Sequence, residues 1–200
     1  MVELKNEGKI KYIGLSEISA RTLRRAEKIH HIDAVQIEYS PFAIDIESDT
    51  IGLLKTCREL GVAVVAYSPL GRGMLTGRYK SPSDLEEGDF RRFAPRFSEE
   101  NFPKNLQLVE KLSTLAKKKG CTSGQLSLAW LLAQGEDIIP IPGTKKIKYL
   151  EENKGALDVK LSAEEEKEIR SVVEAAEVHG TRYPAERSGR LFGDTPELKP

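Results

Sequence analysis

The sequence contains few of the residues that mark specialised protein classes. Of its 200 residues only two are cysteine, one is tryptophan and 6% are aromatic. Two cysteines, Cys57 and Cys121, are too few for a disulfide framework or a cysteine-based metal centre. We interpret them as reduced thiols of a cytoplasmic protein. The three histidines have no neighbours at metal-ligand spacing, so no metal site is expected.

An excess of either charge is also absent. Thirty-one Lys and Arg balance thirty-one Asp and Glu, which argues against nucleic acid as a partner. No window approaches 18 uninterrupted apolar residues, so no membrane span is expected. The first twelve residues, MVELKNEGKIKY, have no apolar core and do not resemble a signal peptide. With 39% hydrophobic residues, residues 1–200 are expected to form one globular unit.

Four short apolar runs predict buried β-strands, because each is rich in β-branched residues and too short for a helix. Patterns typical of amphipathic helices lie between and after these runs. Thr122 with Gln125, and Ser162 with Glu165, predict capping boxes at two helix starts. The alternation of strands and helices predicts an α/β fold with a parallel sheet. The predicted strands are residues 11–15, 34–38, 62–67 and 138–141.

Two segments have no regular pattern. Residues 71–103 are too long for an ordinary connection and predict either a lid or a solvated insertion pinned by Phe90, Phe93 and Phe97. The tail, residues 179–200, contains enough apolar residues to dock on a neighbour but not to fold alone. At the other end, residues 4–8 resemble the last turn of a helix that a strand follows almost at once. That start predicts a truncated domain.

Candidate ligand-binding residues follow the predicted strands, where parallel α/β folds place their functional groups. The third strand leads into YSPLGRG (residues 67–73) and the fourth into PGTKK (residues 142–146). Glycine lets backbone N–H groups approach a phosphate, and Arg or Lys adds charge-assisted hydrogen bonds. Two interpretations of these turns are equally favoured. The turns bind a phosphate-bearing ligand, or their glycines serve only to permit a tight change of chain direction. The spacing of Gly71, Gly73 and Gly77, with no helix following, argues against a Rossmann site.

A family resemblance rests on five stretches in this order: IKYIGLSE, AVQIEYSPF, VVAYSPLGRGMLTG, IIPIPGTKK and YLEEN. Together they resemble the aldo-keto reductases, and most closely the fungal and plant branch of auxin-induced and perakine-reductase-type proteins. The resemblance covers essentially the whole chain, including GTRYP at residues 180–184. It implies a (β/α)8 TIM barrel of which the four strands are strands five to eight, the C-terminal half. It also implies NADP(H)-dependent reduction of aldehydes or ketones to alcohols.

The resemblance also implies a role for each matching position. Ser16 and Gln36 would hydrogen-bond the nicotinamide carboxamide, and Tyr67 would stack on its ring. Residues 68–73 would wrap the pyrophosphate. The turn at residues 143–145 would hold the adenosine 2′-phosphate through Thr144 and Lys145, and residues 152 and 153 would contact the adenine. The implied cofactor-binding set is Ser16, Gln36, Tyr67, Ser68, Pro69, Leu70, Gly71, Arg72, Gly73, Gly143, Thr144, Lys145, Glu152 and Asn153.

Two positions depart from the family pattern within this half. Glu17 stands where many relatives have Asn, so the polar contact to the nicotinamide is expected to differ. Tyr149 stands where relatives often have Arg, and loss of a guanidinium removes a planar phosphate clamp. Lys145, Lys146 or Lys148 could replace its charge, and the preference for NADPH over NADH is left open.

The larger departure is that the catalytic residues of the family lie outside this half. Family catalysis uses a tyrosine as proton donor, helped by a lysine, an aspartate and a histidine on the first four strands. No catalytic residue is therefore expected in this chain. It is expected to be the cofactor-binding half of a reductase whose small carbonyl substrate needs the N-terminal half. The alternatives are a non-catalytic NADP(H)-binding regulatory module and an inactive truncated product. The open edges of a half barrel predict self-association.

Overall fold

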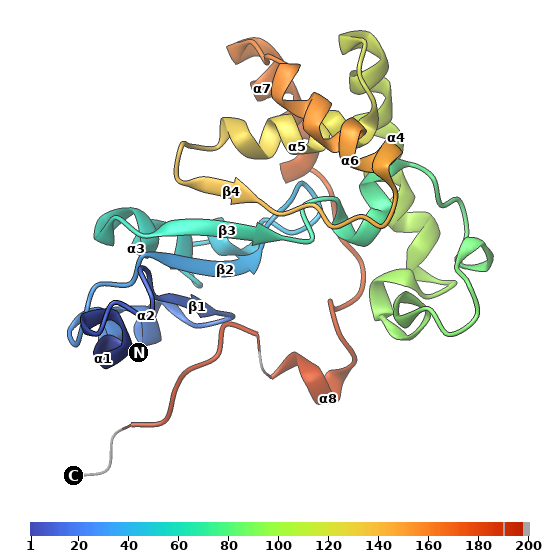
Figure 1. Cartoon of the computed structure of the whole chain (residues 1–200). Helices are drawn as coiled ribbons and strands as arrows, with labels where there is room; N and C mark the ends of the chain where they lie inside the picture. The colour runs from blue at the N-terminus through green and yellow to red at the C-terminus, as the bar shows by residue number, and fades with distance from the viewer. Residues whose placement is uncertain (190, 198–200) are drawn as a thin grey trace.

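A four-stranded parallel sheet forms the centre of the fold in the computed structural model, which describes residues 1–189 and 191–197 (Figure 1). Its strands lie side by side in chain order, as expected for right-handed strand–helix–strand units. The predicted parallel α/β arrangement is therefore confirmed. The strands are β1 (Gly14–Ser16), β2 (Ala34–Glu38), β3 (Ala63–Tyr67) and β4 (Ile138–Pro140).

Helices connect and flank these strands. Two of them, α5 and α7, begin with the capping boxes predicted at Thr122–Gln125 and Ser162–Glu165. None of the helices in the described part of the chain is long and apolar enough to cross a bilayer. The helices are α1 (Val2–Asn6), α2 (Ala20–Glu27), α3 (Leu53–Leu60), α4 (Asn101–Lys119), α5 (Ser123–Ala133), α6 (Ile147–Lys154), α7 (Ala163–Glu174) and α8 (Ala185–Ser188).

The two faces of the sheet differ in burial. Val35, Val64 and Ile138 lie in register across β2, β3 and β4, and all three are buried. Helices α3 and α5 pack on β3 and β4. The opposite face carries Ser16 and Gln36, both exposed, and Ile139, which is 49% exposed. Parallel sheets usually have both faces covered. In this chain helices cover one face, and the face that carries Ser16, Gln36 and Ile139 is open.

Strand β3 begins one residue later than its apolar run predicts and β4 ends one residue earlier, and the largest difference lies at the start of β1. The run predicted for β1 starts at residue 11, but Lys11 and Tyr12 are exposed and β1 begins only at Gly14. The reason lies in the backbone of Ile13, whose N–H donates to Oδ2 of Asp33 at 2.8 Å rather than to a neighbouring strand. A side-chain contact of this kind leaves no trace in the hydrophobic pattern.

The long segment after β3 consists of short 3-10 turns at Gly71–Thr76, Pro82–Asp84, Phe90–Phe93 and Pro95–Phe97. Helix α4 begins at Asn101, inside the stretch predicted to be irregular. Of the three phenylalanines considered as pins, only Phe97 is buried. Phe90 and Phe93 are 39% and 68% exposed. The segment is therefore held by Phe97 together with the buried side chains of Met74, Leu75 and Leu85, and by arginine contacts.

Candidate functional site

The carboxyl ends of β1, β2 and β3 bring several of the predicted residues together. Ser16 lies in register with Gln36, and Glu38 lies in register with Tyr67. Ser16 and Gln36 are exposed on the open face of the sheet, where most neighbouring side chains are small or apolar. A hydroxyl beside a carboxamide offers hydrogen-bond donors and acceptors to one ligand group.

Tyr67 is held from across the sheet. Its Oη donates to Oε1 of Glu17 at 2.5 Å, so the residue after β1 bonds the last residue of β3. Burial, this hydrogen bond and the negative charge of Glu38 raise the pKa of Tyr67 well above its ordinary value. Tyr67 is therefore a protonated phenol at neutral pH, with its hydroxyl engaged and its ring half-buried.

The turn at residues 68–73 has an unusual backbone. Arg72 and Gly73 have φ angles of +57° and +92°, and a Cβ at Gly73 would lie 3.1 Å from Tyr79. The Arg72 guanidinium turns inward: Nη2 donates to Oε2 of Glu38 at 3.2 Å and Nη1 to the carbonyl of Arg182 at 2.8 Å. The Arg72 carbonyl accepts from Nη1 of Arg91 at 2.8 Å. Side chains of distant segments therefore shape this turn.

The turn after β4 is open to solvent. Gly143, Thr144 and Lys145 are all exposed, and Oγ1 of Thr144 accepts from the N–H of Lys146 at 3.2 Å. Helix α6 begins directly after this turn and receives no capping hydrogen bond from a side chain. The positive end of the helix dipole and the lysine charges make this turn suited to a phosphate group.

A contact that the sequence did not reveal joins the long segment after β3 to α6. The guanidinium carbon of Arg78 lies 4.6 Å from the ring centroid of Tyr149, a cation–π contact between the long segment and α6. A guanidinium thus lies beside the position at which the sequence lacks an arginine. The only sequence signal was an arginine in an irregular segment, and its partner is distant along the chain.

The remaining predicted residues line the same region. Pro69 is buried and Leu70 half-buried, while Glu152 and Asn153 are half-buried on α6. A Cβ at Gly124 would lie 3.7 Å from Cδ2 of Leu70 and 3.8 Å from Oε1 of Glu152. Gly124, in the first turn of α5, therefore lies between Leu70 of the turn after β3 and Glu152 of α6.

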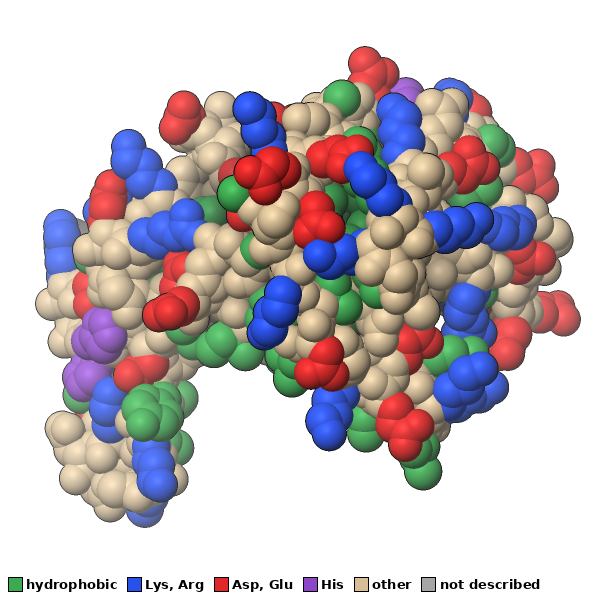
Figure 2. All heavy atoms as spheres, turned by 90° about the horizontal axis from the view of Figure 1, so that it is seen from above, with side chains coloured by type: hydrophobic (Ala, Val, Ile, Leu, Met, Phe, Trp, Pro, Cys, Tyr) green, Lys and Arg blue, Asp and Glu red, His purple; other side chains and the backbone are tan. Residues whose placement is uncertain are grey.

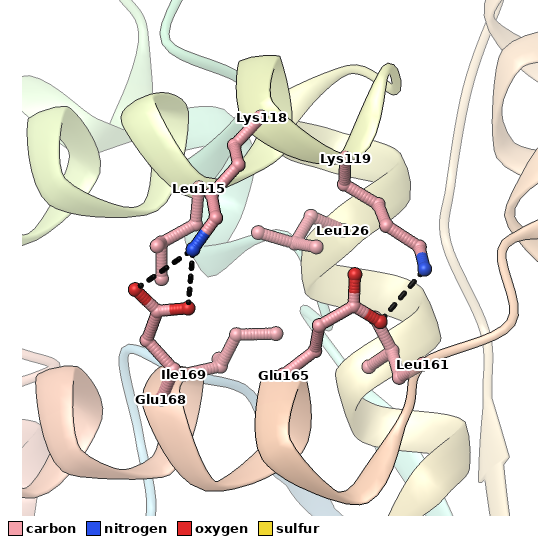
Figure 3. A pocket seen from close by; sticks show the side chains of 8 residues that line it. All are labelled: Leu115, Lys118, Lys119, Leu126, Leu161, Glu165, Glu168 and Ile169. Atoms are coloured by element: carbon pink, nitrogen blue, oxygen red, sulfur yellow. Dashed lines mark hydrogen bonds and ion pairs between the residues drawn. The ribbon is translucent and has the colours of Figure 1, made fainter.

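A pocket elsewhere on the molecule lacks these features. It lies between α4, α5 and α7, with an apolar lining that includes Leu126 and Ile169 (Figure 3). Two ion pairs span its mouth, Lys118 with Glu168 at 3.1 Å and Lys119 with Glu165 at 2.7 Å. None of the predicted site residues lines it. We therefore place the candidate site at the strand ends.

One face of the molecule carries mixed charge, and the described residues form no candidate metal centre. On the face shown in Figure 2, Lys and Arg side chains alternate with Asp and Glu, and neither sign forms a continuous patch. Among residues 1–189 and 191–197, no cluster of three or more His, Cys, Asp or Glu side chains could hold a metal ion.

Comparisons with known proteins agree on one family. The sequence model of the Aldo/keto reductase family matches residues 1–174. The chain is 60% identical over 191 residues to "Aldo-keto reductase yakc [NADP(+)]" of Schizosaccharomyces pombe, covering 96% of this chain and 56% of that protein. It is 58% identical over 198 residues to "Aldo-keto reductase str7" of Strobilurus tenacellus, covering 99% of this chain and 58% of that protein. The chain thus spans just over half the length of these curated relatives.

Solved structures show the same relationship. A glycerol dehydrogenase, AKR11B4 from Gluconobacter oxydans, superposes with a TM-score of 0.78 at 26% identity, over 90% of this chain and 54% of that one. A thermostable aldo-keto reductase, Tm1743, in complex with the inhibitor epalrestat, superposes with a TM-score of 0.64 at 32% identity. That match covers 86% of this chain and 52% of the other. The four-stranded unit is therefore similar to about half of each of these structures.

Proposed function

Because this chain belongs to the aldo/keto reductase family, we propose that it is the cofactor-binding half of an NADP(H)-dependent reductase of aldehydes and ketones. The NADP(+) in the name of the S. pombe relative supports the choice of cofactor. The glycine-containing turns after β3 and β4 support the assignment of the four strands as strands five to eight, since TIM barrels often bind phosphate after strands seven and eight. In this proposal the carbonyl substrate binds only to the complete barrel, because its site also needs residues of the N-terminal half.

The observation that carries this proposal is the register of Ser16 with Gln36 beside Tyr67 at the strand ends. In an NADP(H) enzyme the nicotinamide supplies or accepts a hydride. Ser16 and Gln36 offer donors and acceptors to its carboxamide. The ring of Tyr67, fixed through its hydroxyl, offers a flat surface on which one face of the nicotinamide rests.

The second turn fits the phosphate end of the same ligand. Thr144 and Lys145 are exposed beside the uncapped first turn of α6, and Arg78 stacks on Tyr149 of that helix. A phosphomonoester would receive charge-assisted hydrogen bonds from these groups. This donor set favours NADP(H) over NAD(H), because only the former has a phosphate on the adenosine ribose.

A second candidate, binding without turnover, also has a specific observation in its favour. The hydroxyl of Tyr67 is bonded to Glu17, and that of buried Tyr39 is bonded to Glu47. The pKa of each phenol is raised, by burial first and then by the carboxylate it bonds, so neither is a ready proton donor near neutral pH. We therefore propose that this chain by itself binds NADP(H) and does not reduce carbonyl compounds. A cofactor-sensing module would have the same properties.

A fluorescence titration of NADPH tests the proposal. The 200-residue chain should bind NADPH saturably, and an aldehyde panel should show no turnover. Gln36→Ala should weaken binding about fivefold to tenfold, because it removes a hydrogen bond to the carboxamide. The matched control is Gln107→Ala on the exposed face of α4, which should bind like the wild type. A chain that unfolds cooperatively yet shows no binding at millimolar NADPH would contradict the proposal.

A further inference from the structure

Glu38 is a buried carboxylate at the carboxyl end of β2, and only 2% of it is exposed. Three guanidinium groups surround it: Arg72 at 3.2 Å, Arg96 at 3.6 Å and Arg182 at 4.0 Å. These arginines come from the turn after β3, the long segment and the C-terminal tail. A carboxylate this buried is tolerated only when it is paired, so Glu38 draws three distant segments to one point.

The charges of this cluster balance. Nη2 of Arg182 donates to Oδ2 of Asp45 at 2.6 Å, and Nη1 lies 3.9 Å from Oε1 of Glu17. Three carboxylates therefore meet three guanidinium groups. Within the described residues, Nη1 of Arg96 and Nη1 of Arg182 are buried with no hydrogen-bond acceptor in reach. The buried charge at Nη1 of Arg96 is therefore compensated by the ion pair with Glu38. The charge at Nη1 of Arg182 is compensated by the surrounding carboxylates.

Arg72 connects this cluster to the tail. Its Nη1 donates to the carbonyl of Arg182 at 2.8 Å, and its guanidinium lies 4.5 Å from the ring centroid of Tyr183. Its backbone belongs to the turn at residues 68–73. Through one side chain, the turn proposed to wrap the pyrophosphate is therefore fastened to the tail.

The tail makes a close approach just before this cluster. Gly180 has a φ of +84°, and a Cβ there would lie 2.7 Å from the backbone of Pro95. Nε of Arg96 donates to the Gly180 carbonyl at 3.3 Å. Asn105 of α4, which is 1% exposed, accepts from the N–H of His179 at 2.8 Å. Only glycine permits the tail to approach the long segment this closely.

Beyond the cluster the tail reaches the end of β1. The N–H of Gly193 donates to the Glu17 carbonyl at 2.8 Å, and the Gly193 carbonyl accepts from the N–H of Ser19 at 3.1 Å. Arg182 also lies over the ring of Phe192, 5.0 Å from its centroid. Figure 1 shows this course: the tail passes the carboxyl ends of the strands and returns to β1. We name the described residues 179–189 and 191–195 the C-terminal strap.

We propose that Glu38 is a positioning residue whose buried carboxylate fastens the C-terminal strap to the turn after β3, making the strap part of the frame of the cofactor site. The side chain of Arg72 then acts by shaping the turn, since its guanidinium is taken up by Glu38 and the strap. The assembly of strap and turn stands on the contacts described above. Its consequence for cofactor affinity rests on the proposed function.

Hydrogen–deuterium exchange of the 200-residue chain tests the assembly without any ligand. Glu38→Gln keeps the shape and removes the charge, and it should speed amide exchange in the strap at least about tenfold while exchange in α5 is unchanged. Glu38→Asp, which keeps the charge, should restore part of the protection. Glu174→Gln is the control, because that carboxylate is 61% exposed and its guanidinium partner lies 3.9 Å away. It should exchange like the wild type.

Two further variants guard against misfolding. Arg182→Gln frees the strap but leaves Glu38 paired with Arg72 and Arg96. Gly180→Ala opens the strap by a backbone clash and changes no charge. Both should speed strap exchange as Glu38→Gln does. Unchanged strap exchange in folded Glu38→Gln and Arg182→Gln overturns the proposal.

An NADPH titration with the same variants tests the effect on the site. Glu38→Gln should raise the NADPH dissociation constant about tenfold without changing its salt dependence, because it removes no charge that touches the ligand. Lys145→Ala should flatten the salt dependence. A strap that opens while NADPH affinity stays constant overturns the positioning role. A wild-type chain that binds no NADPH defeats the proposed function, and strap exchange still decides the assembly.

Discussion

Glu17 follows β1 and Tyr67 ends β3, with β2 between these strands, yet Oη of Tyr67 donates to Oε1 of Glu17 at 2.5 Å. The bond spans the strand between them and fixes an aromatic ring at the edge of the open face. Glu17 also bonds the strap through its backbone carbonyl, which accepts from Gly193 at 2.8 Å. One residue therefore contacts both the proposed nicotinamide platform and the strap.

The first prediction concerns this bond. Glu17→Ala leaves the Tyr67 ring without its anchor and should weaken NADPH binding about threefold to tenfold, the cost of one hydrogen bond. Tyr67→Phe retains the ring but removes the same hydrogen bond, so it should weaken binding by a similar factor. Fluorescence titration of both variants and of the double variant measures the coupling. Additive effects would show that the hydrogen bond does not position the ring.

A second prediction concerns the choice between cofactors. Arg78→Ala should weaken NADPH binding about tenfold and leave NADH binding unchanged, since the guanidinium on Tyr149 lies beside the proposed phosphate turn. Arg24→Ala, which removes a 48% exposed arginine of α2 that pairs with Glu59 of α3, is the matched control. Calorimetric titrations with NADPH and NADH give the ratio of their two dissociation constants for each variant. Equal losses for NADPH and NADH would remove Arg78 from phosphate recognition.

Thiol reactivity gives a third prediction. Cys57 is fully buried, and burial together with the charge of Asp137 raises its pKa to about 12. Because only the thiolate is nucleophilic, Cys57 should react with a disulfide reagent at pH 8 at least about a thousandfold more slowly than free cysteine. Burial also raises the pKa of Cys121, so it should react more slowly than free cysteine. Rapid labelling of two thiols in the native chain would mean that α3 opens readily.

Acid stability gives a fourth prediction. Burial alone would raise the pKa of Asp45, but the charge and hydrogen bond of Arg182 outweigh it and hold the pKa below the ordinary 3.8. The resulting stability is fully present above the unfolded pKa and is lost as pH falls through the lower folded value. Urea unfolding should show Asp45→Asn less stable than wild type at pH 6, with the difference narrowing below about pH 4.

The exposed Asp158→Asn variant is the control for this measurement. It should follow the wild type at every pH. A difference between Asp45→Asn and wild type that stays constant down to pH 3 would show that the ion pair with Arg182 does not couple to protonation.

The open face of the sheet gives a fifth prediction, self-association of the 200-residue chain. Ile139 and Ile141 are 49% and 42% exposed, and the edges of β1 and β4 are unpaired among the described strands. Sedimentation velocity should show concentration-dependent association that Ile139→Lys reduces. Ile29→Lys, at an isoleucine 75% exposed near α2, should not reduce it. A chain that stays monomeric at high concentration would contradict this expectation.

Much of the architecture was predictable because local patterns specify it. The run at residues 34–38 predicted β2 with its observed bounds, and both capping boxes lie where the sequence placed them. These features depend on residues close together in the chain. The start of β1 was predicted too early, because Asp33 captures the N–H of Ile13.

The contacts that frame the candidate site were not predictable in the same way. Glu38 looked like the end of an apolar strand, and its three arginine partners lie in segments without a periodic pattern. Arg78 and Tyr149 meet only because the long segment folds back on α6. The register places Ser16 beside Gln36, and their roles toward a cofactor stay predictions for the experiments above.

We expect the turns after β3 and β4 to bind one NADP(H) molecule together. Hydrogen–deuterium exchange of the chain with and without saturating NADP⁺ measures whether both turns contact it. Binding at both turns should slow exchange in peptides that contain residues 67–74 and 143–149, leave α2 unchanged, and give weaker protection with NAD⁺ at the second turn. Protection of neither turn, or of one turn alone, would contradict it.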